Sequence, residues 1–185
     1  MHTLIVTAHP STKGFTHRIA ETIRKKRELQ GHSVEICNLY DAENQLPYLA
    51  FEDVHDVTTT PQIERFHLMI RKADELIFIH PLWWGNMPAI MKNWLDNVLK
   101  SGFAFQYTAK GPKGLLQGKT ARVFCTGGSP WWLYACILFP FFIVWRLFVL
   151  GFCGIKVKNT TYMHNSPKQT EQDRQLFLHK VEAML

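Results

Sequence analysis

Four consecutive apolar residues, Leu76 to Ile79, are the feature that most constrains the fold of this chain. A run without polar alternation is typical of a strand covered on both faces, as in a parallel sheet. We expect the strand to stop at His80-Pro81, because proline cannot donate to a sheet ladder. A helix with one apolar stripe follows Pro88, so this segment predicts a buried strand, a loop and a helix.

Further apolar runs alternate with helical patterns on either side of this segment. Such an alternation predicts an α/β fold: a doubly wound five-stranded parallel sheet with helices on both faces. The length of 185 residues suits one domain, 1–185, with a sizeable core. We expect further strands over 3–8, 32–39, 121–126 and 155–162, helices over 16–29, 61–73 and 167–185, a surface excursion over 40–61 and a mobile loop over 110–119.

The formal net charge of +6 could favour an anionic partner. The basic run 24–27 is interpreted as a solvated helix face, and no nucleic-acid motif accompanies it, so we expect no nucleic-acid partner. The four cysteines lie far apart, without a His/Cys cluster at metal spacing, so we expect no metal. Reduced cysteines, and the absence of a signal peptide after Met1, favour a cytoplasmic protein.

The loop over 9–16 follows the first predicted strand and precedes a helix. It is rich in turn residues and hydroxyl groups, and Lys13, His17 and Arg18 add positive charge nearby. A helix start offers free N–H groups, and its dipole favours a negative group. This loop is therefore a candidate anion site, although many α/β proteins have polar first loops.

Two more loops follow predicted strands. The loop over 81–87 contains two tryptophans and a glycine, which suits a flat aromatic ligand, although both indoles could instead roof the core. The loop over 126–132 begins with two glycines, which let backbone N–H groups approach a ligand, as a plain turn would also explain. Ligands of doubly wound sheets bind beyond the carboxyl ends of the strands, so the three loops together suit a phosphorylated flat heterocycle.

Residues 131–150 are almost entirely apolar, with Arg146 as the one charge. Their length meets the criterion for a membrane span, but Pro140 interrupts them and the charge would be costly in lipid. A span would also sever the fourth strand from the fifth. We therefore interpret the segment as a helix buried in a subunit interface. Peripheral contact with a bilayer stays open, because so large an apolar surface rarely faces water.

Five segments carry a family pattern: LIVTAHP-x3-GFTHRIA at 4–20, PLWWGNMPAIMKNWLDNV at 81–98, GFAF at 102–105, TGGSP at 126–130 and LGFCGI at 150–155. They resemble the flavodoxin-like NAD(P)H:quinone oxidoreductase family, which includes the DT-diaphorase-type and modulator-of-drug-activity reductases. The resemblance spans nearly the whole chain and implies a flavodoxin-like fold and a flavin-binding homodimer. It also implies two-electron, ping-pong reduction of quinones or similar acceptors by NAD(P)H.

The resemblance assigns cofactor-binding roles to three groups of residues. One group holds the phosphate end of the flavin, the second covers its isoalloxazine ring, and the third hydrogen-bonds its pyrimidine edge. Donors at that edge would stabilise the charge of a reduced flavin. In this order the groups are His9, Ser11, Phe15 and Thr16; then Pro81, Leu82, Trp83, Trp84 and Gly85; then Thr126, Gly127 and Gly128.

The chain departs from the family pattern after the glycine turn. Tyr134 stands one position away from the family's catalytic tyrosine and is the predicted catalytic residue, with proton supply from water as the alternative. The expected cofactor is FAD, because His9 suits a pyrophosphate, and FMN remains the alternative. NADH and NADPH both remain open as co-substrates, although Lys110, Lys113 and Lys119 could bind a 2′-phosphate.

Three other functions are alternatives to a quinone reductase. A flavin-binding regulatory subunit of a membrane transporter, such as a potassium efflux system, would suit the basic charge and the apolar segment. A one-electron carrier of the flavodoxin type would be strongly acidic, whereas this chain is basic. An α/β domain without a ligand would require three ligand-competent loops to coincide by chance.

Overall fold

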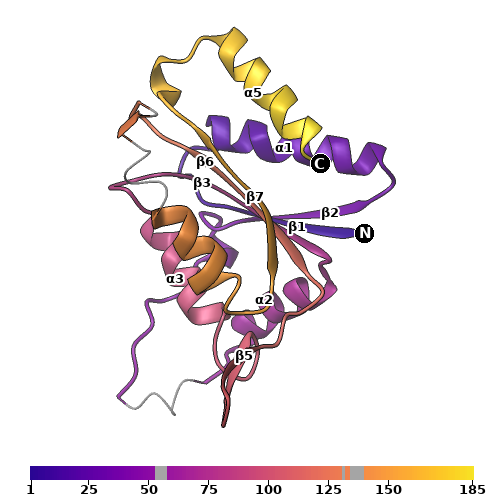
Figure 1. The fold of residues 1–185 in the computed structure, drawn as a ribbon, viewed down its shortest axis with the longest axis vertical. Helices are drawn as coiled ribbons and strands as arrows, with labels where there is room; N and C mark the ends of the chain where they lie inside the picture. Colours follow the sequence, from indigo (N-terminus) through magenta and orange to yellow (C-terminus); the bar gives the residue numbers. More distant parts are fainter. Residues whose placement is uncertain (53–57, 131, 134–139) are drawn as a thin grey trace.

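The computed structural model describes residues 1–52, 58–130, 132–133 and 140–185 (Figure 1). Its centre is a five-stranded sheet of order β2-β1-β3-β6-β7, in which every neighbouring pair is parallel. This order is the flavodoxin-like form of a doubly wound sheet, so the predicted fold class is confirmed. The strands are β1 (His2–Thr7), β2 (Ser33–Asn38), β3 (Glu75–Pro81), β6 (Thr120–Thr126) and β7 (Lys156–Met163).

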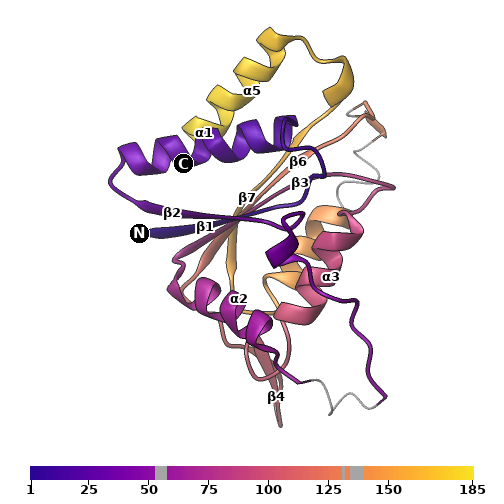
Figure 2. The same cartoon turned by 180° about the vertical axis from the view of Figure 1, so that it is seen from behind.

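Helices cover both faces of the sheet, as Figures 1 and 2 show. On one face, α1 (Phe15–Leu29) and α5 (Glu171–Ala183) pack over a cluster that includes Ile5, Ile77 and Phe124. On the other face, the larger cluster joins Leu4, Val6 and Phe78 to α2 (Pro61–Lys72), α3 (Ala89–Val98) and the helical residues after position 140. Alternate residues of β1 and β3 thus enter opposite cores, as the period of a strand requires.

Strand β3 runs through Pro81, two residues beyond its predicted end. Its pairing with β1 stops at Ile79, whereas its pairing with β6 continues to Pro81. Successive amides point to opposite neighbours, and the Leu82 N–H donates to the Thr126 carbonyl at 2.7 Å. The missing N–H of Pro81 therefore faces the side where pairing has already ended, and the strand loses no hydrogen bond.

A second, two-stranded antiparallel sheet consists of β4 (Phe105–Thr108) and β5 (Gly111–Gly114). The prediction of a mobile loop over 110–119 was therefore wrong for β5. The Thr108 hydroxyl donates to the Gly111 carbonyl at 2.7 Å, and Gly111 takes a positive φ of 107° that suits glycine. These features close a tight hairpin, which projects from the end of the molecule opposite the carboxyl ends of β3 and β6 (Figure 1).

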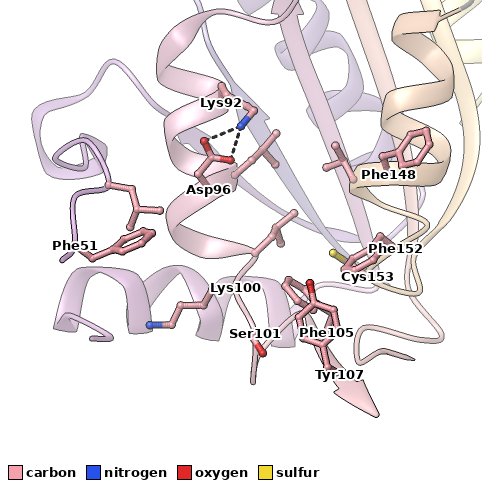
Figure 3. A pocket seen from close by; sticks show the side chains of 14 residues that line it. Phe51, Lys92, Asp96, Lys100, Ser101, Phe105, Tyr107, Phe148, Phe152 and Cys153 are labelled. Carbon is pink, nitrogen blue, oxygen red and sulfur yellow. Dashed lines mark hydrogen bonds and ion pairs between the residues drawn. The ribbon is translucent and has the colours of Figure 1, made fainter. Parts of the chain in front are cut away.

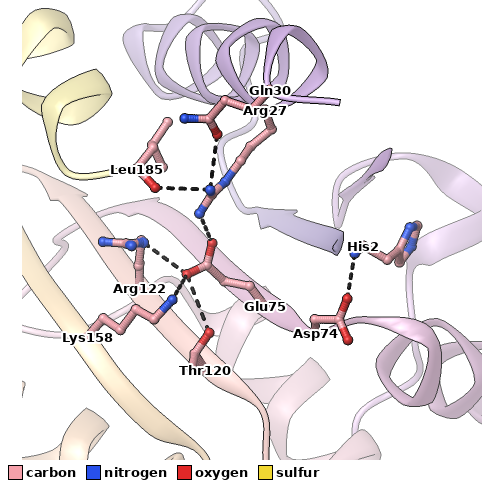
Figure 4. A network of polar contacts seen from close by, with 9 residues as sticks. All are labelled: His2, Arg27, Gln30, Asp74, Glu75, Thr120, Arg122, Lys158 and Leu185. Carbon is pink, nitrogen blue, oxygen red and sulfur yellow. Dashed lines mark hydrogen bonds and ion pairs between the residues drawn. The ribbon is translucent and has the colours of Figure 1, made fainter. Parts of the chain in front are cut away.

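A buried ion network lies at the amino edge of the sheet (Figure 4). Glu75 is fully buried and forms ion pairs with Arg27, with Arg122 at 3.0 Å and with Lys158 at 3.2 Å. Arg27 also donates to the Leu185 carbonyl oxygen at 3.0 Å, which ties α1 to the last residue. The prediction that the whole basic run 24–27 is solvated was wrong for Arg27, because its guanidinium pairs with a carboxylate inside the fold.

The apolar segment over 131–150 is described at 132–133 and from Pro140 onward. Residues 140–143 are α-helical and continue into a π-helical stretch, Val144–Val149. Trp145 is fully buried against Phe78, whereas Leu147 and Phe148 are exposed. Within the described ranges, no helix combines the length and the apolar character needed to cross a membrane.

Candidate functional site

The carboxyl ends of β1, β3 and β6 lie side by side, because β3 stands between the other two strands. The Ala8 N–H donates to the Ile79 carbonyl at 3.0 Å, and the Leu82 N–H donates to the Thr126 carbonyl. The loops after these three strands therefore leave the sheet at one edge, where the strand order also reverses. This reversal between β1 and β3 is the switch point at which ligands of doubly wound folds bind.

The loop after β1 holds the His9 imidazole in a defined orientation. His9 Nδ1 accepts from the Ser11 N–H at 3.0 Å and also lies 3.1 Å from the Ser11 carbonyl oxygen, so the ring is held through Nδ1. A Cβ on Gly14 would stand 2.9 Å from two atoms of this ring. Glycine at position 14 therefore makes the space that His9 occupies. The sequence analysis missed this role, although Gly14 opens the GFTHRIA segment that carries the resemblance.

The N-terminus of α1 faces the same edge without a side-chain cap. The first amides of a helix have no partner within it, so the N–H groups of Phe15 and Thr16 are available to an anion. His17 Nε2 is buried without a partner among the described residues. Arg18, in contrast, is bound to Glu171 by two hydrogen bonds of 2.9 and 2.5 Å, so its charge is compensated within the protein.

Phe15 contributes its backbone to this edge more than its ring. The ring packs against Phe177 of α5 at a centroid distance of 6.0 Å. The guanidinium groups of Arg18 and Arg174 lie 5.6 and 5.8 Å from its centroid. These contacts anchor the start of α1 on α5, and thereby fix the direction in which the helix dipole points.

The loop after β3 is a two-residue hairpin turn. Trp83 and Asn86 exchange backbone hydrogen bonds of 2.8 and 2.9 Å, and the central residues Trp84 and Gly85 both have positive φ, 53° and 75°. This is the type I′ geometry, which normally selects asparagine and glycine. Trp84 is fully exposed and Trp83 is 42% exposed, so the interpretation that both indoles roof the core is wrong.

Pro81 and Leu82, which precede the turn, have buried side chains. They can reach a ligand at this edge only through their backbone. The exposed indoles therefore form the aromatic part of the site.

The glycine turn after β6 offers one free backbone donor. The Gly127 N–H donates to the Met163 carbonyl at 3.0 Å, and the Gly127 carbonyl accepts from Ser166 at 2.8 Å. The Gly128 N–H has no hydrogen-bond partner within the described part of the chain. A Cβ at position 128 would meet nothing closer than the Pro167 ring at 3.8 Å. The Gly128 N–H is thus available to a ligand, whereas the Gly127 N–H is hydrogen-bonded to Met163 at the end of β7.

Other predicted residues lie outside this edge. Tyr134 falls outside the described residues, so its catalytic role stays a prediction. Lys110 and Lys113 belong to the β4–β5 hairpin at the far end of the molecule (Figure 2). Lys119 donates to the carbonyls of Arg71 and Ala73 at 2.9 and 2.6 Å, which caps the end of α2. Lys119 is therefore already engaged within the fold.

A cavity of about 770 Å³ lies away from the three loops (Figure 3). Its walls are one side of α3, residues 148–153 and the side chains of Phe105 and Tyr107. None of the predicted site residues lines it. Across the described ranges, no group of three or more His, Cys, Asp or Glu side chains is arranged to hold a metal ion.

A profile of the family described as "Flavodoxin-like fold" matches residues 1–185. An uncharacterized NAD(P)H oxidoreductase of Haemophilus influenzae is 35% identical over 133 residues, which cover 70% of this chain and 65% of that protein. Human ribosyldihydronicotinamide dehydrogenase [quinone] is 31% identical over 179 residues, covering 83% of this chain and 77% of that protein. The crystal structure of Smu.1420 from Streptococcus mutans is 32% identical, covers 100% of this chain and 98% of its own, and superposes with a TM-score of 0.89.

The fold and the three loops thus define a protein of the flavodoxin-like class. Within this class, the chain belongs to the NAD(P)H:quinone oxidoreductase family.

Proposed function

We propose that this chain is a flavin-dependent oxidoreductase that transfers a hydride from NAD(P)H, through a bound flavin, to quinones or similar acceptors. The observation that carries the proposal is the meeting, at one sheet edge, of an uncapped helix N-terminus, two exposed indoles and a free glycine amide. An anionic, flat and polar-edged cofactor needs these three features together. The names of the H. influenzae and human relatives support NAD(P)H as the donor and a quinone as the acceptor.

The residues at this edge fit a flavin mononucleotide unit. His9 Nε2 and the amides of Phe15 and Thr16 would bind the phosphate end, and the space left by Gly14 keeps His9 in place. Trp83 and Trp84 would cover the ring system, and the Gly128 N–H would donate to its pyrimidine edge. A bound flavin would supply the hydride chemistry, while the chain orients both substrates against one face of the ring.

FAD and FMN both contain the mononucleotide unit that this edge fits. Our expectation of FAD rests on His9 alone. A solved FMN-dependent NADH-azoreductase from Bacillus anthracis, in complex with FMN, has the same fold with a TM-score of 0.77. At 19% identity that likeness concerns the fold only. We propose FMN beside FAD as a candidate because the residues at this edge fit the mononucleotide unit that both cofactors contain.

The apolar surface beside α3 suits the partner subunit of a homodimer. Leu147 and Phe148 are exposed there, next to the cavity of Figure 3, whose wall includes Tyr107. Burial of such a surface is favourable by about 25 cal/mol per Å². The whole chain would then act as one flavin-binding domain in a cytoplasmic homodimer, with peripheral contact with a bilayer as the alternative use of this surface.

The second candidate is a flavin-bearing regulatory subunit of a membrane transporter. The same exposed apolar residues and the net charge of +6 favour it. Such a subunit would co-purify with a membrane protein, whereas an oxidoreductase would turn over unaided.

The visible spectrum of the purified protein, recorded without oxygen before and after NADPH or NADH, tests the proposal. Flavin bands that bleach with either nucleotide, and recover when a quinone is added, are the expected result. Flavin that stays oxidised with both nucleotides would favour the regulatory subunit. A protein that takes up neither FAD nor FMN would overturn the assignment of all three loops, and heat release of the bound cofactor separates FAD from FMN.

A further inference from the structure

His80 is a buried histidine at the carboxyl end of β3, one residue before the segment that leads into the tryptophan turn. Its side chain is fully buried. The imidazole stacks on Trp145 at a centroid distance of 5.8 Å and an interplanar angle of 23°, and it meets Phe141 edge-on at 5.8 Å. An apolar cage of this kind would accept a phenylalanine equally well, so the polar atoms of the ring need a separate explanation.

Both ring nitrogens of His80 have partners, and the partners define the tautomer. Nδ1 lies 2.8 Å from the Pro81 carbonyl oxygen, which can only accept, so Nδ1 carries the proton. Nε2 is then an acceptor, and the Cys125 Sγ lies 3.6 Å from it. Burial lowers the pKa of His80 to about 4, so the ring is neutral near pH 7. Burial also raises the pKa of Cys125, which keeps the thiol protonated as a donor.

These contacts hold one peptide group from both sides. The carbonyl of the Pro81–Leu82 peptide accepts from His80, and its N–H donates to the Thr126 carbonyl at 2.7 Å. A peptide plane that is hydrogen-bonded at both its oxygen and its nitrogen cannot rotate without breaking one of the two bonds. One further peptide, Leu82–Trp83, connects it to Trp83, where the hairpin turn begins.

We propose that His80 is a positioning residue: with Cys125 as its partner, it fixes the Pro81–Leu82 peptide and thereby the angle at which Trp83 and Trp84 meet the flavin. The proposal rests on the proposed function, because the turn must cover a flavin for its angle to matter. His80 itself does not touch the cofactor, and acts through the backbone of the loop.

Two substitutions separate this role from simple core filling. His80→Phe keeps the stack on Trp145 but removes the donor to Pro81. His80→Asn places an amide N–H near the position of Nδ1 but leaves a cavity beside Trp145. We expect His80→Phe to weaken flavin binding about tenfold, and to lower the melting temperature of the flavin-free protein because the buried Pro81 carbonyl loses its donor. We expect His80→Asn to lower the melting temperature and to keep flavin affinity within about threefold.

Matched controls come from the same chain. His67 is also a buried histidine with a backbone carbonyl partner, but it belongs to α2, and its partner Val98 is the last residue of α3. Cys37 is a buried cysteine on β2, and therefore matches Cys125 in burial. His67→Phe and Cys37→Ala are expected to leave flavin affinity unchanged, whereas Cys125→Ala is expected to weaken it by about two- to threefold.

Two measurements decide the proposal. Flavin dissociation constants of wild type and variants are determined by fluorescence titration with FMN and FAD, beside the melting temperatures of the flavin-free proteins. Long-range ¹H–¹⁵N spectra of the flavin-free wild type report the tautomer of His80 directly.

Each outcome has a distinct meaning. An Nδ1–H tautomer supports the proposal when flavin binding is weaker in His80→Phe, slightly weaker in Cys125→Ala, and unchanged in His67→Phe and Cys37→Ala. An Nε2–H tautomer, or equal flavin affinity in wild type and His80→Phe, overturns it while the proposed function stands. A wild-type protein that binds neither flavin overturns the proposed function and this proposal with it.

Discussion

The two ends of the central sheet use polar groups in opposite ways. At the amino edge, the Glu75 carboxylate gathers Arg27, Arg122 and Lys158 into a network buried within the protein (Figure 4). At the carboxyl edge, the imidazole of His9, the amides at the start of α1 and the amide of Gly128 point outward. The charges of the first edge are paired within the protein, whereas the second edge leaves backbone donors available to a ligand.

This difference separates the residues that hold the fold from those that serve its function. A charge buried in a network stabilises the native state only while its partners remain, so its loss is costly. A free donor at an exposed loop contributes little to the free energy of folding, so its loss lowers ligand affinity rather than stability. Substitutions at the two edges are therefore expected to move different measurements.

Removal of the carboxylate at the amino edge has the largest expected effect. Glu75→Ala leaves three cations together without their shared anion, and we expect the free energy of unfolding to fall by about 3–5 kcal/mol. Denaturation in urea measures the change. The control is Glu64→Ala, whose ion pair with Arg71 at 2.7 Å is exposed and should cost at most about 1 kcal/mol. Equal losses in the two variants would contradict the contrast between the edges.

Acid should weaken the same edge. Burial by itself raises the pKa of Glu75, but the charges of Arg122, Arg27 and Lys158 outweigh it, so the pKa lies below its ordinary value of 4.5. A lowered folded-state pKa means that the carboxylate stabilises the protein above about pH 4.5, and that this contribution is lost as the pH falls through the folded-state pKa. We expect melting temperatures to fall more steeply below this pH in wild type than in Glu75→Gln. Melting temperatures that fall equally with pH in the two proteins would refute this prediction.

At the carboxyl edge, Gly14→Val is expected to act on binding. The new Cβ would stand 2.9 Å from the His9 ring and displace it from the anion site. We expect flavin affinity to fall about 100-fold, which corresponds to about 2.7 kcal/mol. Flavin titration checks this, and Gly128→Ala is the milder comparison because position 128 has room for a methyl group. Tight flavin binding by Gly14→Val would show that His9 does not bind the flavin.

The smallest expected effect is that of Trp84→Ala. The indole is fully exposed, so its loss should leave the melting temperature nearly unchanged. Loss of the stacking surface should weaken flavin binding or raise the KM for quinone by about tenfold or less. Steady-state kinetics with a soluble quinone distinguish the two effects. An unchanged affinity and KM would show that Trp84 serves another partner.

The sequence predicted the fold and the three loops that meet at the carboxyl edge, because those features are local. Apolar runs such as 76–79 need no partner to be interpreted as buried strands, and glycine or tryptophan loops directly after them mark one sheet edge. The role of Arg27 could not be predicted in this way. Its partner Glu75 lies 48 positions away, and the composition of the run 24–27 is that of a solvated helix.

The same limit applies within the site. The contact between His80 and Cys125 joins residues 45 positions apart and depends on the register of β3 against β6. The separation of Gly127 from Gly128 into a structural and a free donor depends on Met163, which belongs to β7. The sequence pattern predicts that such residues lie near the site, whereas their hydrogen-bond partners, and therefore their separate roles, follow only from the fold.

The tryptophan turn has a consequence for attempts to stabilise this protein. A left-handed conformation at a residue other than glycine or asparagine costs roughly 1–2 kcal/mol, and Trp84 carries it without any packing in return. A selection for thermal resistance in the absence of ligand would therefore favour Trp84→Asn, the residue that this turn normally takes. The variants that such a selection enriches would be more robust as proteins and poorer as flavin binders.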